Sequence, residues 1–119
     1  MLIEDKDMTL GFRKPENINE EMMGKLNKYL KNRKCAYFAK LVLIRIYNNK
    51  TLEPLENEHY CVIIKPTDKF NFDKDTYNIF EIMRSYLEED SDFVDFSVLG
   101  YLKTIQIYDD NDNGVYIYK

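Results

Sequence analysis

The feature that most constrains the fold is an uninterrupted run of strand-forming residues at positions 35–47. The run is rich in β-branched and aromatic residues and contains no Gly or Pro, which predicts the central strand of a sheet. By alternation, one face carries Ala36, Phe38, Val42, Ile44 and Ile46, and the other carries Tyr37, Ala39, Leu41, Leu43 and Tyr47. Because both faces are apolar, we expect the C-terminal segment or another chain to cover the face that helices leave open.

Size and composition predict one domain. The chain has 119 residues, of which 45% are hydrophobic and 32% are charged, so we expect a single α+β domain over residues 1–119, with residues 1–7 as a flexible N-terminal segment. An acidic start and the lack of an apolar run long enough to cross a membrane predict a cytoplasmic protein with no membrane partner. Cys35 and Cys61 lie far apart in strand-like sequence, which predicts buried reduced thiols.

The spacing of apolar residues predicts further strands and two helices around the central run. Asn17 and Glu20 have the spacing of a capping box, and Asp73 is the expected N-cap of the second helix. The expected strands are 8–13, 35–47, 58–65 and 93–99, the helices are 18–30 and 74–87, and a terminal hairpin joins 104–108 to 115–118. This order predicts a ferredoxin-like β-α-β-β-α-β core, with both helices on one face of a mainly antiparallel sheet, plus a C-terminal β-hairpin.

Charge is unevenly distributed along the chain. Residues 1–50 hold eleven Lys and Arg against six acids, whereas residues 51–119 hold six against fifteen. The C-terminal part also concentrates tyrosines beside acids, which is typical of a surface that contacts a basic protein and disfavours nucleic acid. The expected partner surface consists of Tyr108, Asp109, Asp110, Asp112, Tyr116 and Tyr118.

Residues that carry chemistry are few. The loop 109–114 matches the first half of a calcium-binding loop, but the chain has no glutamate at the required twelfth position, so we predict a hairpin loop there. His59 is the only histidine and has no recognisable orienting partner, so we expect it at the surface or at the rim of a strand. The sequence therefore predicts no catalytic residue, no metal site and no cofactor.

Several short motifs occur in an order that resembles a known family. They are 11–15, the helix 18–30, Ala36-Tyr37-Phe38-Ala39, Val94-Asp95-Phe96 and Tyr116-Ile117-Tyr118-Lys119. They resemble the C-terminal domain of the bacterial enhanced-serine-sensitivity (SseB-type) proteins, although Phe38 stands where that family has Leu. The resemblance implies a cytosolic bacterial accessory or interaction domain without established catalytic residues.

Taken together, these features predict a non-enzymatic interaction domain that binds a basic protein partner through its acidic, Tyr-rich C-terminal surface. One alternative is an immunity protein that neutralises a toxin, since such proteins are small and acidic and complement a basic site. A second alternative is a small-ligand domain or enzyme that uses a groove between the sheet and the loop carrying His59. A homodimer that buries Tyr37, Leu41 and Leu43 is also expected if the hairpin does not cover that face.

Overall fold

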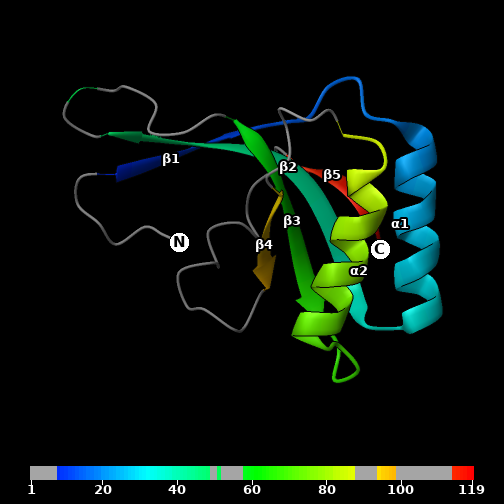
Figure 1. The fold of residues 1–119 in the computed structure, drawn as a ribbon. Helices are drawn as coiled ribbons and strands as arrows, with labels where there is room; N and C mark the ends of the chain where they lie inside the picture. The colour runs from blue at the N-terminus through cyan, green and yellow to red at the C-terminus, as the bar shows by residue number, and fades with distance from the viewer. Residues whose placement is uncertain (1–7, 49–50, 52–57, 88–93, 99–113) are drawn as a thin grey trace.

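The computed structural model describes residues 8–48, 51, 58–87, 94–98 and 114–119, which form an α+β fold (Figure 1). Its elements are β1 (Met8–Arg13), α1 (Glu20–Arg33), β2 (Ala36–Asn48), β3 (His59–Pro66), α2 (Phe72–Arg84), β4 (Val94–Val98) and β5 (Val115–Tyr118). Both helices lie side by side on one face of a mainly antiparallel sheet, as predicted (Figure 1). Within the described ranges, no helix is both long and apolar enough to span a membrane.

The sheet is built around β2, as the sequence predicts. The order is β1-β2-β3-β4, with antiparallel pairing of β2 to β1 and β3, and parallel pairing of β3 to β4. The last strand, β5, also pairs antiparallel with β2, on the edge that β1 uses. Since β1 leaves this edge opposite Leu43 and β5 begins opposite Leu41, the two strands follow one another along β2 in the same direction.

The ferredoxin-like arrangement is not confirmed. In a split β-α-β unit, the two strands joined by a helix are parallel and another strand lies between them. Here β1 and β2 are joined by α1 but pair directly and antiparallel. The other half of the expected terminal hairpin, 104–108, lies outside the described residues, as does the expected flexible segment 1–7.

Both helices begin two residues away from the predicted position. The N-cap of α1 is Asn19, whose side-chain oxygen accepts a hydrogen bond from the Met22 amide at 3.0 Å, so the capping-box prediction at Asn17 is wrong. The N-cap of α2 is Asn71 rather than Asp73, and it accepts from the Lys74 amide. Asn is as good an N-cap as Asp, so these local signals did not distinguish neighbouring positions.

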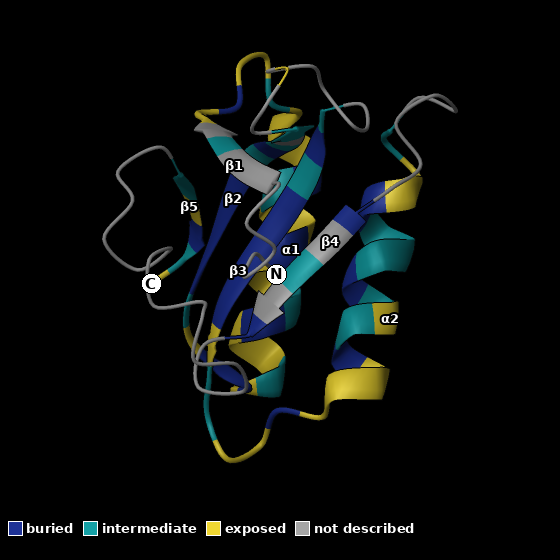
Figure 2. Ribbon diagram, turned by 90° about the vertical axis from the view of Figure 1, so that its left-hand side faces the viewer, coloured by how far each residue is buried: buried dark blue, intermediate teal, exposed yellow. Residues whose placement is uncertain are grey.

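Both faces of the central sheet are buried, as the two apolar faces of β2 predict (Figure 2). On the helix side, Leu26 and Leu41 are fully buried in one core, and on the opposite side Val42 and Ile63 are equally inaccessible. This burial is reached within one chain. Leu41, one of the residues expected at a homodimer contact, packs in the core beneath the helices, and the homodimer itself stays a prediction. The two cysteines are free and buried, as predicted.

A buried carboxylate joins the two helices. Asp75 of α2 is fully buried and accepts hydrogen bonds from the Arg33 guanidinium of α1, at 2.8 and 3.1 Å. The Tyr29 hydroxyl and the backbone N–H of Asn71 also donate to this carboxylate. The side-chain amide of Asn78 donates to the Tyr29 hydroxyl. The network satisfies the oxygens of a buried charge, which would otherwise be costly.

The network also sets the charge state of its members. Burial by itself raises the pKa of Asp75, but the hydrogen bonds from Arg33 and Tyr29 outweigh it, so the pKa lies below its ordinary value. Burial, followed by the hydrogen bond to Asp75, raises the pKa of Tyr29. At neutral pH, α1 and α2 are therefore joined by an ionised pair.

Candidate functional site

The candidate site lies where β1 leaves the edge of β2 and β5 begins. After Arg13 the chain turns away from the sheet through Pro15, which has no amide hydrogen with which to continue the ladder. Asn17 then adopts a left-handed conformation with φ of 54°, which Asn tolerates better than most residues. A polar pocket and a more open groove share Asn17 as a lining residue.

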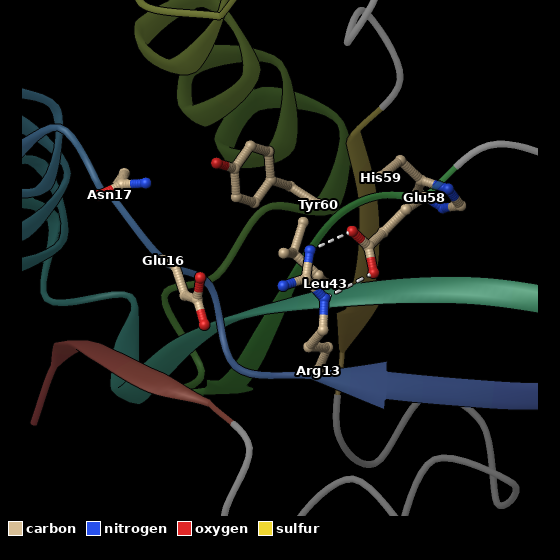
Figure 3. A pocket seen from close by; sticks show the side chains of 7 residues that line it. All are labelled: Arg13, Glu16, Asn17, Leu43, Glu58, His59 and Tyr60. Carbon is tan, nitrogen blue, oxygen red and sulfur yellow. Dashed lines mark hydrogen bonds and ion pairs between the residues drawn. The ribbon is translucent and has the colours of Figure 1, made fainter.

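The polar pocket has a volume of about 310 Å³. It is lined by Arg13, Glu16, Asn17, Leu43, Glu58, His59 and Tyr60 (Figure 3). Two hydrogen bonds join the Arg13 guanidinium to the Glu58 carboxylate, at 3.0 and 2.5 Å. Because the pair is bidentate, it fixes the end of β1 against the start of β3 and gives the pocket a polar wall.

Two polar groups of this pocket, the Arg13 guanidinium and the Glu58 carboxylate, change each other's pKa. The hydrogen bond from Arg13 lowers the pKa of Glu58, and the hydrogen bond to Glu58 raises the pKa of Arg13. His59 is 4% exposed, so the expectation of a surface or rim histidine is wrong, and its ring points away from the centre of the pocket (Figure 3). The arrangement can hold a small polar ligand, but it does not present the imidazole as a base.

The groove lies between the start of α1 and the start of β5 and has a volume of about 540 Å³. It is lined by Pro15, Asn17, Ile18, Glu20, Met23, Val115 and Tyr116. Ile18 comes from the segment that enters α1, Met23 lies in α1, and Val115 and Tyr116 come from β5. Segments nearly a hundred positions apart therefore build one open surface of mixed polar and apolar character.

Tyr116 borders this groove and is held by three neighbours. Its ring packs edge-on against Phe38 at 6.1 Å between centroids, and the Lys40 and Lys119 ammonium groups lie 5.0 and 4.6 Å from the ring centroid. Lys40 also lies 5.5 Å from the Phe38 ring. The Tyr116 side chain nevertheless remains 45% exposed. We call Phe38, Lys40, Tyr116 and Lys119 the Tyr116 cluster.

The expected partner surface is described only in part. Tyr116 is exposed as expected, whereas Tyr118 is half-buried and packs against the core. The remaining members of the expected surface lie outside the described residues: Tyr108, Asp109, Asp110 and Asp112. Lys40 and Lys119 place positive charge beside the Tyr116 ring, and the acidic character of this surface stays a prediction because its acids lie outside the described residues.

Sequence reasoning missed the residues that position Tyr116. Phe38 and Lys40 are two positions apart on β2, so alternation places them on one face, but nothing in the sequence pairs that face with β5. The Arg13–Glu58 pair was missed for the same reason, since 45 positions separate its members. The sequence pointed to the polar pocket only through the alternative of a small-ligand groove near His59.

Metal ligands do not gather in the part of the chain that the structure describes, where no three His, Cys, Asp or Glu side chains could hold an ion. No model of a known protein family matches the chain, and no curated protein is significantly similar to it. The resemblance to the SseB-type C-terminal domain therefore stays a prediction, and function must be argued from the geometry of this site.

Proposed function

We propose that this chain is a non-catalytic protein-interaction domain that contacts its partner at Tyr116 and the adjoining groove. The observation that carries the proposal is that Tyr116 is held by Phe38, Lys40 and Lys119 and yet is 45% exposed. A fixed aromatic side chain loses little conformational entropy on binding, which is why tyrosines are frequent at the energetic centres of interfaces.

The groove supports the same proposal. Ile18, Met23 and Val115 line the groove beside Tyr116, together with the polar residues Asn17 and Glu20. Protein interfaces typically combine aromatic and apolar groups with polar ones. The resemblance to the SseB-type domain, which implies an accessory or interaction role, agrees with this function.

The test is to identify the partner by affinity capture from lysate and then measure its affinity for purified variants. Tyr116→Ala should weaken binding by at least about 2 kcal/mol, roughly thirtyfold in Kd, as expected at the centre of an interface. Tyr77→Ala is the matched control, because Tyr77 lies on α2 and is 62% exposed. Equal affinity of the two variants would rule out Tyr116 as the contact.

The polar pocket supports a second candidate function, the binding of a small polar ligand. The pocket is large enough for a small metabolite, and Arg13, Glu58 and Tyr60 supply donors and acceptors at its wall. A ligand at about a hundred times its Kd would stabilise the fold by about 2.7 kcal/mol. A metabolite screen by thermal shift should then give a rise in Tm that Arg13→Gln abolishes and Lys14→Gln retains. No shift with any metabolite, or a shift that survives Arg13→Gln, would exclude this pocket.

A further inference from the structure

We propose that the Tyr116 cluster recognises an acidic segment of the partner protein, with an apolar side chain of that segment in the adjoining groove. This inference rests on the proposed interaction function and adds the chemical class of the partner. The Lys40 and Lys119 ammonium groups lie 5.0 and 4.6 Å from the centroid of one exposed ring. Two positive charges at a single aromatic side chain create a local positive potential that attracts carboxylates.

Lys40 gives the inference its second observation. Its side chain is only 8% exposed, and among the residues that the structure describes it forms no ion pair. Its ammonium group lies near two aromatic rings, whose faces offset only part of the cost of removing a charge from water. A carboxylate from a partner at the exposed edge of Tyr116 would offset more of this cost by attracting the Lys40 ammonium group.

The surroundings of the cluster define an orientation for the segment. Glu20, which also lines the groove at the start of α1, would repel acidic residues there. The acidic residues should therefore lie beside Lys119 and an apolar residue should occupy the groove, with no acid near Glu20.

Recognition should depend on side chains rather than on addition of a strand to β5. The Ile117 carbonyl already accepts a hydrogen bond from the Asn27 side chain of α1, at 2.9 Å. A peptide strand would have to displace this bond in order to pair along the outer edge of β5. The specificity should accordingly follow the charge of the peptide.

The test is a selection of binders from a random-peptide library on the immobilised domain, followed by affinity measurements with the synthetic peptides. We expect enriched sequences that combine Asp or Glu with a neighbouring apolar residue, and binding that weakens as salt rises. Lys119→Glu should reduce the affinity about tenfold, because it turns an attraction into a repulsion. Lys28→Glu is the control, since it makes the same change of charge on the exposed side of α1.

The outcomes separate this inference from the proposed function. Basic or uncharged peptides that lose affinity in Tyr116→Ala would overturn the acidic partner and leave the interaction domain in place. Acidic peptides that bind Lys119→Glu and Lys28→Glu equally would also overturn the inference. Peptides that bind Tyr116→Ala as tightly as the unmodified chain would overturn both. Lys40→Met, checked for a retained Tm, should lower the affinity for the acidic peptides as Lys119→Glu does.

Discussion

Replacement of Arg33 by Met should lower the free energy of unfolding by about 3 kcal/mol, near the lower end of the cost of breaking a buried ion pair. The substitution leaves the Asp75 carboxylate fully buried while removing its counter-charge and two hydrogen bonds. The lower end applies because the Arg33 side chain is 31% exposed. Denaturant unfolding at neutral pH measures the change, which is a large part of the roughly 5–15 kcal/mol that stabilises a domain.

Arg84→Met is the matched control for this prediction. Arg84 pairs with Glu81 at 3.6 Å, and the two side chains are 69% and 42% exposed, so its loss should cost at most about 1 kcal/mol. Combining Arg33→Met with Asp75→Leu should recover part of the lost stability, because the second change removes the buried charge. Similar small losses in Arg33→Met and Arg84→Met would contradict the assignment of Asp75 as a buried, ionised link between the helices.

Acidification should destabilise the fold through the same carboxylate. The pKa of Asp75 in the folded chain lies below its ordinary value, so the unfolded chain binds the proton first as the pH falls. The stabilisation is complete above the pKa of an unfolded Asp, about 3.9, and is lost progressively as the pH falls through the folded pKa. The loss should be smaller than that caused by Arg33→Met, because protonation also removes the buried charge that Arg33→Met leaves without a partner.

The measurement is the free energy of unfolding as a function of pH, for the unmodified chain and for Asp75→Asn. The slope at acidic pH should be clearly smaller in Asp75→Asn, because the group that titrates is gone. Glu58 also has a lowered pKa, but its partner Arg13 is half exposed and contributes less to the slope. Glu81→Gln serves as the control and should leave the slope almost unchanged. Parallel curves for Asp75→Asn and the unmodified chain would refute the linkage.

The elements were predictable because their signals are local. The run at 35–47 has no breaker and alternates between two apolar sets, and β2 occupies almost the same residues. Met22, Leu26 and Leu30 recur every four positions, and all three are buried in α1. The strand ends shifted by at most one residue. The helix caps shifted by two residues, because several nearby Asn and Asp residues can cap a helix equally well.

The order of the strands was not predictable in the same way. It depends on which edges of β2 are occupied by β1 and β5, two strands about a hundred positions apart. Asp75 shows the same limit in a single residue. Its spacing of four from Ile79 places it on the buried stripe of α2, but nothing local indicates Arg33, 42 positions earlier, as its partner.

The candidate site was predictable only where one residue could be judged by itself. Tyr116 was expected at a surface, and it is exposed. Its charged neighbours were not expected, because Lys40 reaches Tyr116 only through the pairing of β2 with β5. A polar pocket lies in the region of His59 that the small-ligand alternative names, but ligand binding there stays a prediction.

The end-to-end placement of β1 and β5 has a consequence for colloidal behaviour. An uncovered strand edge offers unpaired amides and carbonyls to other molecules, which makes it a site of aggregation. On β2 this protection is divided, because β1 shields positions 43–48 and β5 shields positions 39–41. Loss of either β1 or β5 would therefore expose an edge of β2 to self-association. Both strands thus protect the sheet against aggregation.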